Sequence, residues 1–284
     1  MKKFVAVLII AVMAFALSAC GRIEYYEYDD AELYSVGGQE VNLDGLGEIK
    51  SVEINWLDGE VNVVSGETLS VKEETAVGEE YLPFYYRADD EGALMIKNAK
   101  SGSDYSAVKN QKKKLTVTVP ETVHSVDLVL SRASYNVTAS SVNVVVVDSS
   151  VGSGAIDCEY LSAALVTSIS GNVKITAKAQ LVAALVCVTV SGNAEVALDS
   201  VEDINLSFTS VSGHFESDFE GLKEAVDAAN SAASSSASSS GDENATSAEE
   251  ENDDDYYEYN GKKYKKFTVS FTSISGSFTV NKIA

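Results

Sequence analysis

A repeat of about 21 residues restricts the folds open to this 284-residue chain more than any other feature. Its unit is Ser-Gly followed by a polar and then an apolar residue. The glycines of three successive units, Gly171, Gly192 and Gly213, stand 21 residues apart. Further anchors extend the series in both directions, with a shorter step of 17 residues before Gly171; these anchors are Gly59, Ala133, Gly154 and Gly276.

Apolar residues alternate with other residues on both sides of each anchor, and the same positions stay apolar from unit to unit. Alternation with period two indicates a strand, a tight corner and a second strand. We therefore expect a single-stranded, right-handed parallel β-solenoid with coils of about 21 residues. An antiparallel β-sandwich is the alternative, although the turns of a sandwich would not need to recur at a fixed spacing of 21 residues. The outward positions after the anchors are mostly polar, for example Asn172, Lys174, Asn193, Glu195 and His214.

The N-terminus reads as a secretory leader. Two lysines precede an apolar run of 14 residues, which is too short to span a bilayer comfortably. The sequence Leu-Ser-Ala-Cys-Gly at residues 17–21 resembles the lipobox of bacterial lipoproteins. That resemblance implies a signal peptide over residues 1–19 and acylation of Cys20 by chains such as palmitate. We expect an extracytoplasmic protein, attached to the bacterial cell membrane through this lipid.

Composition divides the remainder of the chain. The acidic residues 20–48 are expected to form an extended tether, and residues 49–284 the solenoid domain. Residues 76–114 interrupt the repeat and are expected to lie over the first coils. Residues 222–262 are rich in Ser, Ala and acids, so this insertion is expected to be disordered, hanging between two stacked coils.

Charge and motif searches exclude several classes of function. The net charge of −22 argues against a nucleic-acid partner, and two histidines make a histidine-based zinc site improbable. No phosphate-binding glycine loop, nucleophile elbow or EF-hand loop is found. We expect no cofactor and no metal site.

Two sets of outward residues are candidate sites. Asp127 and Asp148 are assigned to the same column of consecutive coils, where a carboxylate pair could perform acid/base chemistry on a glycan. Leu165, Val186 and Val188 also fall at outward positions. They are either covered or form an apolar patch for a partner.

The repeats resemble the bacterial putative-adhesin family of β-strand-repeat proteins. The motifs are Val-x-Ile-x-x-x-x-Gly-x-Val-x-Val at residues 52–63, Leu-Thr-Val-Thr-Val-Pro at 115–120 and the Ser-Gly-x-Val coils. The resemblance implies an envelope β-solenoid and carries no catalytic residues. We expect a non-enzymatic, adhesin-like binding or scaffolding module for an envelope protein or surface glycan. An accessory to envelope-stress sensing and a polysaccharide-active enzyme are the alternatives.

Overall fold

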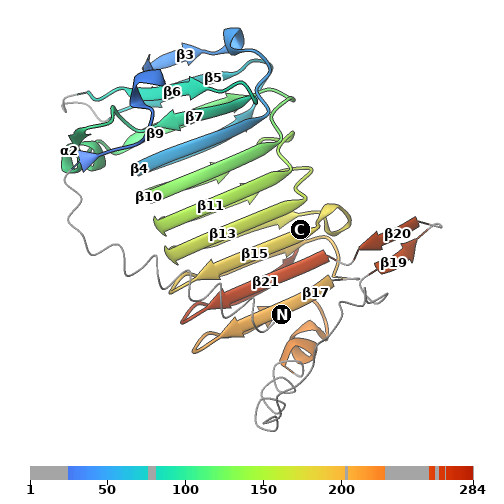
Figure 1. Ribbon diagram of the computed structural model, residues 1–284. Helices are drawn as coiled ribbons and strands as arrows, with labels where there is room; N and C mark the ends of the chain where they lie inside the picture. The colour runs from blue at the N-terminus through green and yellow to red at the C-terminus, as the bar shows by residue number, and fades with distance from the viewer. Residues whose placement is uncertain are drawn as a thin grey trace, which may run out of the picture.

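The chain folds as a parallel β-solenoid, which confirms the predicted fold class and excludes the β-sandwich (Figure 1). The computed structural model describes residues 25–75, 81–201, 204–227, 256–259, 262–265 and 267–283. The predicted signal peptide and Cys20 lie outside these residues. Within the described chain, no helix is long and apolar enough to cross a membrane.

Each coil contains two strands joined at a corner. In β4 (Ser51–Ser65) and β10 (Ser125–Val137) the backbone stays in strand conformation through the corner, and in later coils it breaks there. We call the outer surface of the strands before the corner face 1, and that of the strands after it face 2. The face 1 strands of later coils are β11 (Val144–Val151), β13 (Ala163–Ser170), β15 (Ala184–Thr189), β17 (Ile204–Ser210) and β21 (Phe267–Ser273). Their face 2 partners are β12 (Gly154–Asp157), β14 (Val173–Ala177), β16 (Ala194–Leu198), β18 (Phe215–Ser217) and β22 (Phe278–Lys282).

The register corrects one assigned anchor. Tyr135 pairs with Gly154, so the corner glycine of that coil is Gly152 and not Gly154. A Cβ added at Gly152 would collide with the carbonyl oxygen of Ala133, and one at Gly171 with that of Gly152. The corner glycines therefore permit close backbone contact between coils. A Cβ at Gly154 would instead meet the Tyr135 ring, so Gly154 makes room for an interior aromatic side chain.

The last two coils do not stack in chain order. Strand β21 pairs with β15 on one side and with β17 on the other. Strand β22 likewise lies between β16 and β18. The C-terminal coil is thus inserted between two coils that precede it in the sequence (Figure 1). The predicted stacking of this coil on the coil of Gly213 is confirmed, but its position in the stack was not foreseen.

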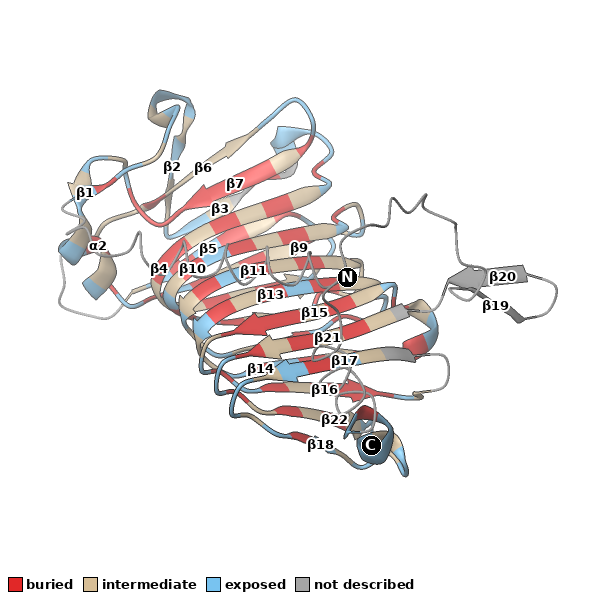
Figure 2. Cartoon of the chain, turned by 60° about the horizontal axis from the view of Figure 1, so that its bottom comes forward, coloured by how far each residue is buried: buried red, intermediate tan, exposed pale blue. Residues whose placement is uncertain are grey.

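The interior is filled by columns of apolar side chains, so that buried and less buried residues alternate along the strands (Figure 2). One column runs through Leu128, Val147, Val166 and Cys187 in successive coils. At the C-terminal end the interior holds four phenylalanines, Phe208, Phe215, Phe271 and Phe278, and the centroids of their neighbouring rings lie 5.1–6.4 Å apart. Burying each such side chain contributes roughly 1.5–3 kcal/mol. Residues 222–227 are helical, and Val226 is buried in the same core.

The N-terminal end is closed by a cap of mainly antiparallel strands. β7 (Ala93–Lys97) and β9 (Lys113–Val119) pair with β4 in parallel, whereas β5 (Ser70–Glu74) and β6 (Phe84–Ala88) pair antiparallel with β9 and β7. The described part of the predicted excursion thus forms the cap. The cap also contains β8 (Ser103–Asp104) and α2 (Tyr105–Asn110).

Residues 25–48 differ from the extended tether that their charge suggested. β2 (Ser35–Gly38) pairs with β6, and β3 (Glu40–Asn42) pairs with β5. β1 (Tyr25–Tyr26) pairs with β8, and short 3-10 turns span Ala31–Leu33 and Asp44–Leu46. Tyr26 and Leu43 are buried. Apolar anchors and backbone pairing with exposed cap edges therefore outweigh the acidic composition.

Residues 228–255 lie outside the described residues, and so does the prediction of disorder for them. After them, β19 (Tyr256–Tyr259) and β20 (Lys262–Lys265) pair as an antiparallel hairpin. The chain then enters β21. A third 3-10 turn, Ala179–Leu181, links β14 to β15.

Candidate functional site on face 2

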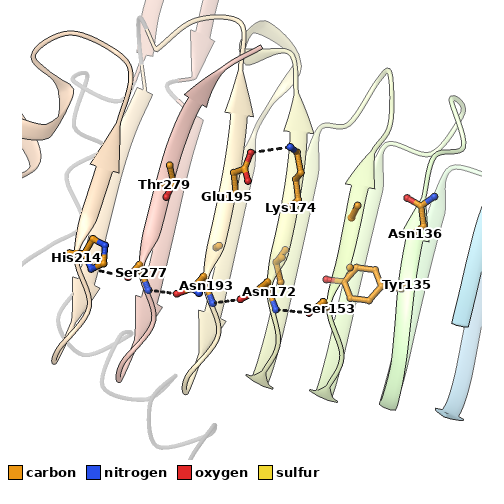
Figure 3. A pocket seen from close by; sticks show the side chains of 14 residues that line it. Tyr135, Asn136, Ser153, Asn172, Lys174, Asn193, Glu195, His214, Ser277 and Thr279 are labelled. Carbon is orange, nitrogen blue, oxygen red and sulfur yellow. Dashed lines mark hydrogen bonds and ion pairs between the residues drawn. The ribbon is translucent and has the colours of Figure 1, made fainter. Parts of the chain in front are cut away.

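The polar residue that follows each corner glycine forms a hydrogen-bonded ladder along face 2 (Figure 3). The Asn172 N–H donates to Ser153 Oγ at 3.0 Å, and the Asn193 N–H to Asn172 Oδ1 at 3.2 Å. The Ser277 N–H donates to Asn193 Oδ1 at 2.9 Å, and Ser277 Oγ lies 3.0 Å from His214 Nδ1. Each coil is therefore connected to the next by a side chain as well as by its strands.

The ladder fixes how the two asparagines present their amides. Because each Oδ1 accepts a backbone N–H of the adjacent coil, each Nδ2 group is left facing outward. Among the described residues, neither Asn172 Nδ2 nor Asn193 Nδ2 has a hydrogen-bond partner. Face 2 therefore carries two outward amide donors on adjacent coils, one strand spacing of about 4.8 Å apart.

A second row of polar residues lies two positions further along the strands. Lys174 Nζ lies 3.0 Å from Glu195 Oε1, and Thr279 continues the row on β22 (Figure 3). The two rows line a shallow, open hollow of about 720 Å³. Tyr135 lines the hollow only from beneath, since its side chain is buried. Such a surface suits an extended polar ligand bound by hydrogen bonds.

Sequence reasoning identified these residues as outward and polar but did not select them as a site. The signal was available, because the positions one and three residues after each anchor are polar in several successive coils. These residues form one site only because they are hydrogen-bonded from coil to coil, and the spacing of the repeat does not reveal those hydrogen bonds.

The carboxylates Asp127 and Asp148 are not in one column. Asp127 lies beside Val146, whereas Asp148 lies beside Val129, so the two are offset along neighbouring strands of face 1. The shift follows from the misassigned corner at Gly154. The direct neighbour of Asp127 on the other side is Glu53.

Burial is the largest cause of the raised pKa of Asp127, and the charges of Glu53 and Asp148 raise it further. Burial alone raises the pKa of Asp148. The charge of Lys97, whose Nζ lies 3.0 Å from Glu53 Oε1, lowers the pKa of Asp127 and so opposes these effects. In the part of the chain that the structure describes, no group of three or more His, Cys, Asp or Glu residues could hold a metal ion.

The three apolar candidates differ in exposure. Leu165 and Val186 are adjacent on β13 and β15, and Leu165 also adjoins Val146. Leu165 is 41% exposed, Val186 is half-buried, and Val188 is buried at 4%. An apolar row thus crosses face 1, but Val188 is not available on its surface.

The described cysteines occupy the interior, where the alternation of inward and outward residues places them. Cys158 and Cys187 are both buried, and neither is in a disulfide. Burial raises the pKa of each thiol to about 12. They are therefore unreactive core side chains rather than candidate nucleophiles.

Comparison with known proteins gives two solved structures of low similarity. One is a putative cell adhesion protein from Clostridium sporogenes ATCC 15579, with 14% identity and a TM-score of 0.48 over 86% of this chain and 98% of the other. The second is a putative adhesin from Bacteroides fragilis NCTC 9343, with 12% identity and a TM-score of 0.39 over 88% of this chain and 97% of the other. No protein-family description matches the chain, and no curated protein matches it. At these values neither similarity bears on what the chain binds, so its function is argued from the surface itself.

Proposed function

We propose that this protein is a cell-envelope lipoprotein whose β-solenoid is a non-catalytic, adhesin-like binding module. The observation that carries the proposal is the polar ladder of face 2, which continues across five coils from Ser153 to His214. A continuous row of outward polar groups, which includes the two free amides of Asn172 and Asn193, favours a ligand that is itself extended and rich in hydroxyl groups. The ligand class proposed is a surface glycan.

The lining of the hollow supports binding rather than glycan hydrolysis. Among the residues that the structure describes, Glu195 is the one carboxylate that lines it, and that carboxylate is paired with Lys174. Most glycoside hydrolases need two carboxyl groups on opposite sides of the bond that is cleaved. The hollow is also open, whereas catalysis benefits from a site that excludes water.

Attachment to the membrane is the second part of the proposal. The lipobox-like sequence ending at Cys20 supports a lipid anchor. The first described strand begins at Tyr25, a few residues further along the chain. A lipid there would hold the N-terminal cap near the bilayer, with the coils extending away from it.

A glycan array probed with the full chain tests the proposal. The chain contains two histidines, which provide a matched pair of variants. His214 lies on the ladder, whereas His124 is exposed before β10 and outside the hollow. We expect His214→Ala to weaken binding to the best glycan by roughly fivefold or more, as the loss of a net hydrogen bond of about 1 kcal/mol predicts. His124→Ala should bind as the wild type does.

Absence of binding to any glycan would contradict the proposed ligand class, and equal loss in both variants would contradict the proposed face.

A protein partner at the apolar row of face 1 is the second candidate function. It is favoured by the contiguity of Val146, Leu165 and Val186. In that case Leu165→Glu would abolish partner binding, while His214→Ala would leave it unchanged.

A further inference from the structure

A lysine, a glutamate and an asparagine meet inside the N-terminal cap, remote from face 2. Lys113, the first residue of β9, and Glu73 of β5 both have fully buried side chains, and Lys113 Nζ lies 3.1 Å from Glu73 Oε2. Lys113 Nζ also donates to the main-chain oxygen of Asn98 at 2.6 Å. Asn98, directly after β7, is 1% exposed.

Aromatic rings enclose this cluster. The Lys113 ammonium lies 5.3 Å from the centroid of the Trp56 ring and 6.0 Å from that of Tyr81. Trp56 Nε1 donates to the Lys113 carbonyl oxygen at 3.3 Å. The surroundings are therefore apolar and contain few groups that could solvate a charge.

The Asn98 carboxamide is held in an unusual way. Its Oδ1 accepts the backbone N–H of Leu57 at 2.8 Å, while its Nδ2 is buried and has no hydrogen-bond partner among the described residues. Glu73 Oε1 is also buried and has no hydrogen-bond partner of good geometry within the described chain, although the Tyr81 hydroxyl and the Phe84 N–H are close enough to favour the ionised carboxyl. A buried polar atom without a full hydrogen bond destabilises the fold, and here two such atoms occur in one cluster.

A buried ion pair with unsatisfied atoms is a poor stabilising device. The loss of hydration of two buried charges can exceed their mutual attraction, and an apolar replacement is often as stable. The arrangement is better explained if these groups react with one another. A primary amine beside a carboxamide whose oxygen is polarised by an N–H group is the reactant pair for amide exchange.

We propose that Lys113 and Asn98 become joined by an intramolecular amide bond between Nζ and Cγ, with Glu73 transferring the proton. The neutral amine of Lys113 attacks Asn98 Cγ, and the Leu57 N–H stabilises the developing charge on Oδ1. Protonated Glu73 donates its proton to Nδ2 and takes up one proton from Nζ, so that the acid is restored at the end of the step. The Cγ–Nδ2 bond then breaks, one ammonia molecule leaves, and no oxidant or other reactant is needed.

The geometry already places the nucleophile at the correct residue. The Asn98 Cγ is three covalent bonds from the carbonyl carbon whose oxygen Lys113 now contacts. The attack requires Lys113 Nζ to move from this oxygen to Cγ by rotation within its own side chain, while Asn98 keeps its hydrogen bond from the Leu57 N–H. Burial lowers the pKa of Lys113 to about 8 and raises that of Glu73, which favours the neutral amine and the protonated acid that the reaction requires.

The bond would close the segment from Asn98 to Lys113, which contains β8 and α2, into a covalent loop. It would also fasten the end of β7 to the start of β9. The cap that follows the proposed lipid anchor would then be locked independently of its hydrogen bonds.

Peptide mapping of the purified full chain by mass spectrometry tests the proposal, and a lipid at the N-terminus does not interfere. We expect a branched peptide that contains both Asn98 and Lys113, lighter by one ammonia than the sum of its two parts. Asn98→Asp should give the same branched peptide by loss of one water instead. Glu73→Gln and Lys113→Met should give the two separate, unmodified peptides.

Lys97→Met is the matched control. Lys97 is also a cap lysine, is 8% exposed and is paired with Glu53, so its variant should keep the branched peptide. Separate peptides from folded wild-type protein would overturn the proposal. A loss of ammonia confined to the Asn98 peptide, without branching, would overturn it equally, because it indicates a succinimide. Since the wild type alone decides the question, a variant that fails to fold does not obscure the result.

Discussion

At the scale of single residues, the corner glycines are required by contact between coils. Gly192 has no left-handed backbone conformation, yet a Cβ there would collide with the carbonyl oxygen of Gly171. Gly171 itself has φ 146°, so it is restricted by both conformation and contact. The single departure, Ala133, is fully buried at the first corner after β4.

Gly192→Ala is therefore expected to destabilise the fold by roughly 1–3 kcal/mol, the range for overpacked sites. Urea unfolding of the full chain measures this change. Gly45→Ala is the control, because no atom lies within 4 Å of its added Cβ, and it should stay within about 0.5 kcal/mol. Equal stability of the two variants would show that the coils can separate at the corner without cost.

The carboxyl of Asp127 provides a prediction on pH. Its pKa in the folded state is raised, chiefly by burial, so the ionised form is less favourable in the folded state than in the unfolded one. The cost is complete above the folded-state pKa and disappears below about pH 3.9, the ordinary pKa of aspartate. Asp127→Asn should therefore have a higher Tm than the wild type at pH 7 and a similar Tm near pH 3.

Thermal melts at the two pH values check this expectation. Asp157→Asn, a substitution of an exposed aspartate on β12, is the control and should change the Tm little at either pH. A lower Tm for Asp127→Asn at pH 7 would mean that the carboxylate forms a stabilising interaction in the folded state.

At the scale of the elements, the sequence predicts the coils better than their order. The period of two and the recurring Ser-Gly unit were enough to predict parallel stacking. The corner at residues 152–154 offers two glycines, and only the contact with Ala133 shows that Gly152 is the corner. Taking Gly154 as the corner shifted the expected register of β11 by two residues, which wrongly placed Asp148 beside Asp127.

The position of the last coil could not be predicted for a different reason. Both possible neighbours of β21 have the same apolar pattern, so either order fills the interior columns. Likewise, the strands of residues 25–48 follow no repeat, because they complete a cap whose edges exist only in the folded protein. In both cases the missing information lies in long-range packing rather than in local spacing.

Disulfide engineering tests the order of the coils. Val186 on β15 is the direct neighbour of Ser270 on β21, whereas Ser207 on β17 lies one strand further. Neighbouring strands are about 4.8 Å apart, within the reach of a disulfide, but two strand spacings exceed its limit of about 7 Å. Val186→Cys with Ser270→Cys should form a crosslink on oxidation, and Val186→Cys with Ser207→Cys should not. The reverse pattern would show that the coils stack in chain order, with β17 and not β21 beside β15.

At the scale of the whole molecule, the two faces of the solenoid have different chemistry. Face 1 combines apolar residues, some of them exposed like Leu165, with the acidic group around Asp127, whereas face 2 has the continuous polar ladder. A stack of coils repeats one outward residue type at regular intervals, which an extended ligand can contact many times. The polar positions were visible in the sequence, but the ladder and its outward amides required the register between coils.

The measurement that tests the central claim most directly is the affinity of two lysine variants for the best-binding glycan. Lys174 and Lys178 are about half exposed, and each is paired with a glutamate, but only Lys174 lines the hollow. We predict that Lys174→Ala weakens binding by roughly fivefold, from the loss of about 1 kcal/mol, and that Lys178→Ala binds like the wild type. Unchanged affinity in Lys174→Ala, or equal loss in both variants, would contradict a binding site on face 2.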